Sequence, residues 1–215
     1  MIGALVMTHG DDHGLRLPPA LAPVQVAIVP IYRSEEEHAL VVEMGSKIRD
    51  ALAGNGIRVR LDDRDQHRPG FKFGEWELKG VPVRMEIGPR DVEADQVVVA
   101  KRTGGDKESL PVAETIAGMA GMLDGIQSGL YEEAKALRNA NTHEAIDYAS
   151  FVEGIASQSG FWVGSWCGDA DCEQKVTADT KATIRILPVE REDPGAACLV
   201  CGRPGVERAT WARAY

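Results

Sequence analysis

The sequence predicts an α/β protein in which a mixed-sheet domain is followed by a smaller α/β domain. Its 215 residues, 44% of them hydrophobic, suit one large or two small domains with buried cores. Short runs rich in β-branched residues alternate with longer stretches whose apolar residues recur at helical spacing, and every cysteine falls in the last quarter of the chain. We expect an N-terminal segment and two domains, at residues 1–21, 22–122 and 123–215.

The first segment is predicted to form two short strands joined by a polar turn. Residues 2–7 are an apolar run typical of a buried strand, residues 8–14 are polar and rich in glycine, and residues 15–17 resume the apolar pattern. Pro18 and Pro19 cannot donate to a strand ladder. These prolines therefore mark a domain boundary.

The middle domain begins with a predicted strand-helix-strand unit. Residues 24–29 predict a strand that is covered on both faces. Ser34, followed three residues later by Glu37, predicts a capping box at the start of a helix that ends near Gly54. The later elements predicted in this domain are strands at 57–61, 81–87 and 96–100, a short helix at 71–78 and a turn at 103–106.

The second domain is predicted to open with a long helix over residues 111–141, with a proline near its first turn. Four glycines between residues 118 and 129 weaken the prediction in its middle. A second helix is predicted at 142–157. The remaining predicted elements are strands at 160–166 and 182–188 around a helix at 171–181.

The charge of the chain argues against a broad basic surface that would wrap nucleic acid. The formal net charge is −9, but residues 56–107 hold eleven Lys or Arg and ten Asp or Glu, so a local RNA contact is possible there alone. The apolar run at 2–7 lacks a basic leader and is too short to span a bilayer. We therefore expect a cytoplasmic protein that binds neither DNA nor a membrane.

The cysteines form two close pairs, Cys167-x4-Cys172 and Cys198-x2-Cys201. Two such pairs can supply the four thiolates of a tetrahedral structural zinc site, and a glycine after Cys167 and after Cys201 lets backbone amides turn toward sulfur. With four sulfur ligands, no position is left for a catalytic water. Two reduced pairs without metal, or a redox Cys-x-x-Cys, are the alternatives.

Residues 58–91 mix arginines, carboxylates and aromatic residues. Arginine can bind the Hoogsteen edge of guanine, a carboxylate can accept from guanine N1 and N2, and rings can stack on unpaired bases. On composition alone, a solvated surface whose arginines pair with neighbouring carboxylates is favoured over an RNA site. His67 and Trp76, taken singly, are expected to be structural.

Several motifs together resemble one family, the C-terminal half of class II prolyl-tRNA synthetases of the archaeal and eukaryotic type. The resemblance covers essentially the whole chain. Its motifs are Thr-His-Gly-Asp-Asp-His-Gly-Leu at 8–15, Leu-Asp-Asp-Arg at 61–64, Pro-Gly-Phe-Lys-Phe at 69–73, Trp-Glu-Leu-Lys-Gly-Val-Pro at 76–82, the four cysteines and the terminal Ala-Tyr.

The resemblance implies an anticodon-binding domain of the class II histidyl type, then a zinc-binding domain whose ligands are the four cysteines. It further implies that Glu77 and Arg84 contact anticodon bases of proline tRNA, which has guanine at its second and third anticodon positions. Arg90 and Lys107 are implied to contact the anticodon stem-loop. Arg90 stands where relatives often carry lysine, which changes the donor geometry. Tyr215 resembles a terminal tyrosine that folds back toward the catalytic centre.

The resemblance also bears on activity. Residues 1–21 correspond to the end of motif 3 in the class II catalytic domain, a remnant of its antiparallel sheet in which His9, Asp11 and Asp12 form no complete catalytic site. The motif 3 arginine would lie immediately before Met1. We therefore expect this chain alone not to adenylate proline, with ATP and proline serving only the full-length ligase.

Two other functions remain open at this stage. The chain could be a free-standing anticodon-binding or RNA-binding module, or a zinc-stabilised interaction protein. A homodimer is also left open.

Overall fold

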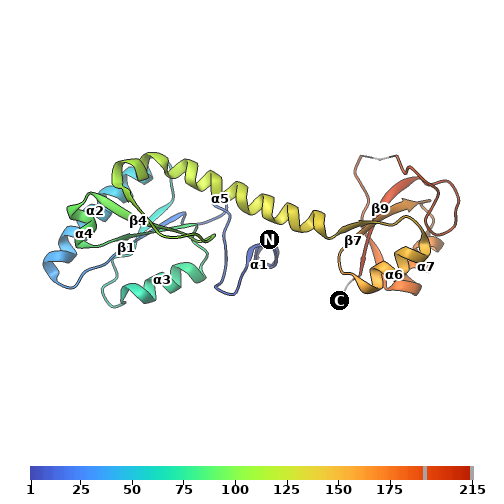
Figure 1. Cartoon of the computed structure of the whole chain (residues 1–215), viewed down its shortest axis with the longest axis horizontal. Coiled ribbons are helices and arrows are strands. Elements are labelled where there is room, and N and C mark those ends of the chain that lie inside the picture. Colours follow the sequence, from blue (N-terminus) through green and yellow to red (C-terminus); the bar gives the residue numbers. More distant parts are fainter. Residues whose placement is uncertain (191–192, 214–215) are drawn as a thin grey trace. The chain divides into compact units, whose positions relative to one another are not determined.

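The computed structural model describes residues 1–190 and 193–213, and its contacts divide the chain into two compact units, Met1–Ala134 and Lys135–Tyr215 (Figure 1). The prediction for Tyr215 lies outside the described residues. The long helix α5 (Val112–Ala140) runs through residue 122, where we predicted a domain boundary, and through the division at Ala134. The three predicted domain ranges themselves stay a prediction.

The first unit is built on a mixed five-stranded sheet with the order β2-β1-β3-β4-β5. β1 pairs in parallel with β2 and β3, while β4 pairs antiparallel with β3 and β5. The bounds are β1 Val26–Pro30, β2 Val59–Leu61, β3 Val83–Ile87, β4 Gln96–Lys101 and β5 Glu108–Pro111. The predicted mixed α/β class is confirmed, and β5 is a strand that the sequence pattern did not predict.

Helices cover both faces of this sheet. Figure 1 shows α3 (Pro69–Leu78) on the opposite side of the sheet from α2 (Glu35–Gly54) and α5, and α4 (Pro89–Glu93) follows β3 directly. Because side chains alternate along a strand, Ile28 and Met85 enter the core with α2 and α5, whereas Ala27 and Val29 pack against Trp76 of α3. The same alternation directs Arg84 and Glu86 of β3 toward α3.

The predicted cap of α2 forms in part. The Ser34 hydroxyl accepts from the Glu37 amide at 3.2 Å, as a capping box requires. The Glu37 carboxylate, however, accepts from the Arg33 amide at 2.7 Å rather than from Ser34. The helix therefore begins after Ser34, as the sequence predicted. The Glu37 carboxylate accepts from the amide one residue before the expected one.

The prediction of strands in the N-terminal segment is wrong. Residues Ile2–His9 form helix α1, and no strand among the described residues pairs with them. A helix satisfies its own backbone hydrogen bonds, whereas a strand needs a neighbour. The predicted polar turn does form, because the Asp11 amide donates to the Gly14 carbonyl at 2.9 Å and the Gly14 amide returns a bond of 3.1 Å.

The second unit is a four-stranded mixed sheet with the order β6-β7-β9-β8, accompanied by two helices. Residues 142–157, predicted as one helix, divide into strand and helix because the Asp147 carboxylate accepts from the Ser150 amide and starts α6 there. β9 was not predicted. The bounds are β6 Thr142–Glu144, α6 Tyr148–Ser157, β7 Phe161–Trp166, α7 Ala170–Thr180, β8 Ala182–Ile186 and β9 Glu207–Arg213.

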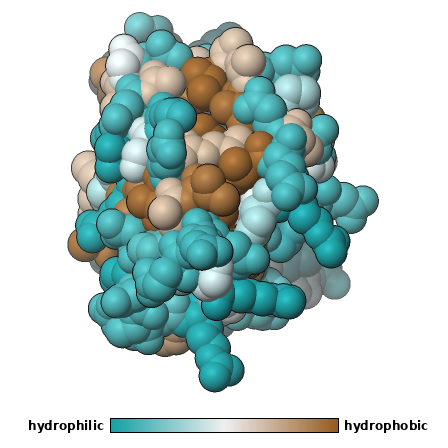
Figure 2. Space-filling model, turned by 90° about the vertical axis from the view of Figure 1, so that its left-hand side faces the viewer, coloured by the Kyte–Doolittle hydropathy of each residue, from teal (hydrophilic) through white to brown (hydrophobic). Residues whose placement is uncertain are grey.

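One face of the first unit carries both polar and apolar residues (Figure 2). Figure 2, which faces the end of the first unit where α2 and α4 lie in Figure 1, shows an apolar area bordered by hydrophilic residues. Among the described residues, no helix combines the length and the apolar character that a membrane span requires.

Candidate metal site and polar cleft

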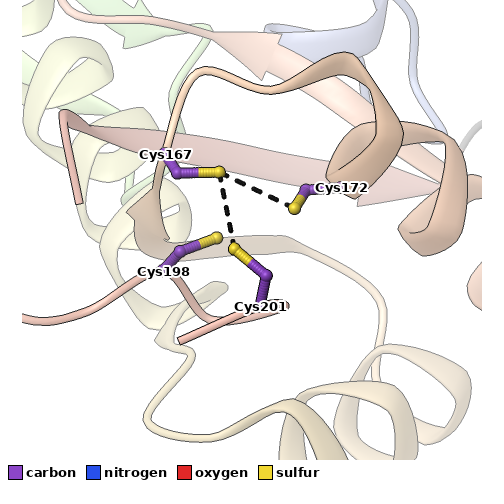
Figure 3. A group of neighbouring side chains, drawn as sticks. All are labelled: Cys167, Cys172, Cys198 and Cys201. Atoms are coloured by element: carbon purple, nitrogen blue, oxygen red, sulfur yellow. Dashed lines mark hydrogen bonds between the residues drawn. The ribbon is translucent and has the colours of Figure 1, made fainter. Parts of the chain in front are cut away.

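The four cysteines of the second unit come together from three separate segments. Cys167 directly follows β7, Cys172 lies in the first turns of α7, and Cys198 and Cys201 lie in the loop before β9. Cys172 and Cys198 are buried, whereas Cys201 is exposed. Figure 3 shows the four sulfur atoms directed toward one another. The fold thus unites the two pairs that the sequence only placed in the same quarter of the chain.

The distances between the sulfur atoms suit a tetrahedral metal ion. All four atoms lie within 4.8 Å of one another, with 3.6 Å between Cys167 and Cys172 and 3.7 Å between Cys167 and Cys201. These distances are too long for disulfides, and all four cysteines are free. Four sulfurs at ~2.3 Å from a central ion are ~3.8 Å apart. This cluster could therefore hold a metal ion.

Backbone geometry beside the cysteines favours thiolates. Gly168 and Gly202, each directly after a cysteine, adopt φ of 79° and 71°, a left-handed conformation that glycine takes without steric cost. This turn lets the amides of Asp169 and Arg203 donate toward the sulfurs of Cys167 and Cys201. The predicted role of the two glycines is thus consistent with the geometry.

Arg203 joins the two cysteine loops. Its Nε lies 3.2 Å from the Cys201 sulfur and its Nη2 donates to Asp169 at 2.5 Å. The hydrogen bond from Arg203 lowers the pKa of the Cys201 thiol to about 6, whereas burial raises the pKa of Cys172 to about 12. A buried thiol with a raised pKa ionises readily only when a cation replaces its proton, as a bound metal ion does.

The first unit contains a polar cleft of about 360 Å³ between α3, β3 and the loop before β5. Three of the four predicted tRNA-binding residues, Glu77, Arg84 and Lys107, line it. Arg102 and the turn at 103–105 line it as well. Arg90 does not, since it lies exposed on α4. The fold thus gathers side chains from segments 30 residues apart around one hollow.

Two cations in the cleft share one buried carboxylate. Arg84 donates through Nε and Nη2 to Oε1 of Glu86 at 3.1 and 3.0 Å, and Lys107 Nζ donates to both oxygens of Glu86 at 2.7 and 2.9 Å. Both cations also lie over the ring of Phe73, at 4.6 and 5.2 Å from its centroid. Glu86 and Phe73 were missed from the sequence. The spacing Arg-x-Glu on a strand, which puts both side chains on one face, was the available signal.

Glu77 faces these cations from α3. Its carboxylate has no hydrogen-bond or ion-pair partner within the described part of the chain, while its backbone carbonyl accepts from Arg102 Nε at 3.0 Å. Arg102, also missed from the sequence, is 6% exposed and forms a two-bond pair with Asp11. The cleft therefore offers an unpartnered acceptor on one side and cationic donors on the other.

The residues of the N-terminal turn serve as structural contacts. Hydrogen bonds from Arg102 lower the pKa of Asp11, and the His13 amide donates to Asp11 at 2.9 Å. The His9 carbonyl accepts from Arg16 Nε at 3.0 Å, whereas Asp12 is exposed. Within the described ranges the cysteines form the only group of possible metal ligands. These contacts fit the polar turn that the sequence predicts at residues 8–14.

The motif at 61–76 forms a buried polar network rather than a binding surface. Asp62 accepts from Arg64 through two bonds of 2.7 Å and from Trp76 Nε1 at 2.8 Å, and Arg64 also pairs with Glu75. Lys72, 1% exposed, donates to the Asp62 carbonyl at 2.9 Å. The expectation that Trp76 is structural fits its burial. The pairing of Arg64 with Asp62 and Glu75 agrees with the expectation that arginines in this region pair with neighbouring carboxylates.

Comparison with known families divides the chain as the two units do. Residues 25–121 match the family described as "Anticodon binding domain". Residues 148–215 match the family described as "Prolyl-tRNA synthetase, C-terminal". The first match contains most of the residues that line the polar cleft, and the second contains the four cysteines.

Curated relatives match along the whole chain. A proline--tRNA ligase of Amoebophilus asiaticus is 41% identical over 215 residues, and one of Oceanobacillus iheyensis is 44% identical over 215 residues. A proline--tRNA ligase of Rubrobacter xylanophilus is 44% identical over 214 residues. The chain spans 44% of the length of each of these relatives.

A solved structure has the same fold. The prolyl-tRNA synthetase of Cryptosporidium parvum, crystallised with L-proline and AMP, matches with a TM-score of 0.88 and 30% sequence identity. The match covers 100% of this chain and 46% of that one.

Proposed function

The chain belongs to the prolyl-tRNA synthetase family, to whose C-terminal part it corresponds, and from this premise we propose that it recognises the anticodon of proline tRNA in support of ATP-dependent proline attachment. The observation that best supports this role is the cleft in which the unpartnered Glu77 carboxylate faces Arg84 and Lys107. In the intact ligase, proline and ATP would be the substrates. The intact ligase would act in the cytoplasm.

The chemistry of the cleft complements guanine. Guanine carries acceptors at N7 and O6 on one edge and donors at N1 and N2 on another. Arg84 and Lys107 offer donors for the first edge, and Glu77 offers an acceptor for the second. Arg90 lies exposed on α4, and its guanidinium has no hydrogen-bond or ion-pair partner among the described residues, so it suits a phosphate of the stem-loop instead. Guanines at the second and third anticodon positions of proline tRNA fit this arrangement.

A binding assay tests the proposal. Gel shifts should show that the chain prefers proline tRNA to a tRNA with another anticodon. Arg84→Ala should cost ~1–3 kcal/mol of binding to the proline tRNA, because a two-bond contact with guanine is lost. Arg60→Ala is the matched control, since Arg60 is exposed on β2 and lies outside the cleft. Equal binding of both tRNAs would instead favour an interaction protein.

We further propose that the four cysteines hold a structural zinc ion. The support is a set of four sulfur donors at tetrahedral spacing, because thiolates are soft ligands that suit zinc and leave no position for water or substrate. Such an ion would fix the loops around Cys167 and Cys201. Elemental analysis after metal-replete expression should find one zinc per chain. Iron in its place, or far less than one equivalent of metal, would refute the assignment.

A further inference from the structure

Glu86 occupies an unusual position in the polar cleft. Its side chain is only 8% exposed, and from the described part of the chain it accepts four hydrogen bonds, two from Arg84 and two from Lys107. Arg84 lies two residues away on the same strand, whereas Lys107 lies 21 residues further along the chain. One carboxylate therefore holds together two donors that would otherwise repel each other across the Phe73 ring.

The direction of the Arg84 contact matters for recognition. Glu86 accepts from Nε and Nη2, which form one side of the guanidinium fork. The other nitrogen, Nη1, has no partner among the described residues, and Nη2 keeps a second hydrogen. The pair of outer N–H groups on Nη1 and Nη2 is the one that contacts guanine O6 and N7 together. Glu86 thus occupies one edge of Arg84 and leaves this other edge free.

We infer that Glu86 is a positioning residue for base recognition, which fixes Arg84 so that its free edge meets the Hoogsteen edge of an anticodon guanine. This inference rests on the proposed anticodon function. A fixed arginine loses less conformational freedom on binding than a mobile one, and a wrong base then leaves its donors unpaired. The same negative charge opposes loose, sequence-independent attraction of phosphates by Arg84 and Lys107. Glu86 therefore contributes discrimination rather than affinity.

The substitution Glu86→Gln tests this role because it keeps the size of the side chain. The Gln amide has only one acceptor oxygen for the two cations. Its NH₂ group is a donor and would lie against a donor of Arg84 or Lys107. Glu43→Gln is the matched control. Glu43 likewise pairs with a lysine, Lys47, at 2.7 Å, but it lies exposed on α2, against the opposite face of the sheet.

The measurement compares the affinity of the full chain for three tRNAs. One has the proline anticodon, one has 7-deazaguanine in place of guanine at the second or third anticodon position, and one has adenine there. Loss of the N7 acceptor should weaken binding to the unsubstituted chain by ~5-fold or more at the position that Arg84 contacts. With Glu86→Gln, we expect this penalty to fall below ~2-fold, while binding of the adenine tRNA stays equal or becomes tighter.

A merely structural role predicts a different pattern, in which all three tRNAs lose affinity by the same factor. That pattern, or a full 7-deazaguanine penalty in Glu86→Gln, would overturn the inference and leave the proposed function standing. If the unsubstituted chain fails to distinguish guanine from adenine, the proposed function itself fails, and the inference with it. Should Glu86→Gln not fold, Glu86→Asp keeps the charge one methylene shorter, and its 7-deazaguanine penalty should be smaller than that of the unsubstituted chain; an equal penalty would overturn the inference.

Discussion

Replacing Asp62 with asparagine should destabilise the first unit while leaving the second unchanged. The Asp62 side chain is 1% exposed and accepts three charge-assisted or indole hydrogen bonds, two from Arg64 and one from Trp76. Asparagine keeps the shape but presents an amide nitrogen to donors and removes the charge opposite Arg64. Arg64 would retain only Glu75 as a partner.

The pKa of Asp62 gives the magnitude. Burial alone would raise this pKa, but the hydrogen bonds from Arg64 and Trp76 outweigh it and lower the pKa from 3.8 to about 2. Such a shift corresponds to ~2 kcal/mol of stability at neutral pH. Because the folded-state pKa is lowered, this contribution is complete well above pH 3.8 and is lost as the pH falls through about 2.

Fluorine NMR of a chain labelled with 5-fluorotryptophan can follow each unit separately during urea unfolding. Trp76 is the only tryptophan of the first unit, and Trp162, Trp166 and Trp211 report on the second. Asp62→Asn should lower the urea midpoint of the Trp76 signal by ~1 M at pH 7. The difference between the two chains should shrink below about pH 4. An unchanged Trp76 midpoint, or a difference independent of pH, would refute this account of the network.

Four further substitutions test helix stability in the first unit and the cysteine cluster in the second. Gly121→Ala in α5 should stabilise the first unit by ~1 kcal/mol, because a Cβ there meets nothing within 4 Å, whereas Gly45→Ala in α2 should not, because its Cβ would lie 2.9 Å from a leucine side chain. Equal thermal shifts would contradict this. Cys198→Ser should lower the zinc content and the urea midpoint of the second unit only. Arg203→Ala should speed zinc release to a chelator without changing the stoichiometry, since Arg203 contacts a sulfur but is not a ligand; an unchanged release rate would argue against this.

Local patterns were sufficient where the physics is local. Ser34 caps a helix through a contact that spans three residues, so the start of that helix could be predicted. Strand β3 could also be predicted, because every second residue of it is apolar and faces the core. Residues 2–7 could not be assigned in the same way. Their apolar character suits a strand or a helix equally, and only the presence or absence of a neighbouring strand decides between them.

The candidate sites show the same division. The resemblance named Glu77, Arg84 and Lys107, and the structure places all three around one cleft. Nothing in the sequence singled out Glu86 or Arg102, because their contacts are made across the sheet and with the N-terminal turn. Arg90 was grouped with the others by resemblance, and the structure puts it outside the cleft they line. The positions of these residues in the sequence do not indicate which of them line the cleft and which lie outside it.

The sequence by itself determined the α/β class, the family and the paired spacing of the cysteines, because each is encoded in short patterns of hydrophobicity or residue type. Only the tertiary structure decided that the sulfur atoms of the two cysteine pairs lie within 4.8 Å of one another. It also decided that the buried Glu86 carboxylate binds both Arg84 and Lys107 in the cleft that Glu77 lines. Such convergence depends on strand order and loop conformation. These follow from the packing of the whole unit, which no local stretch of sequence specifies.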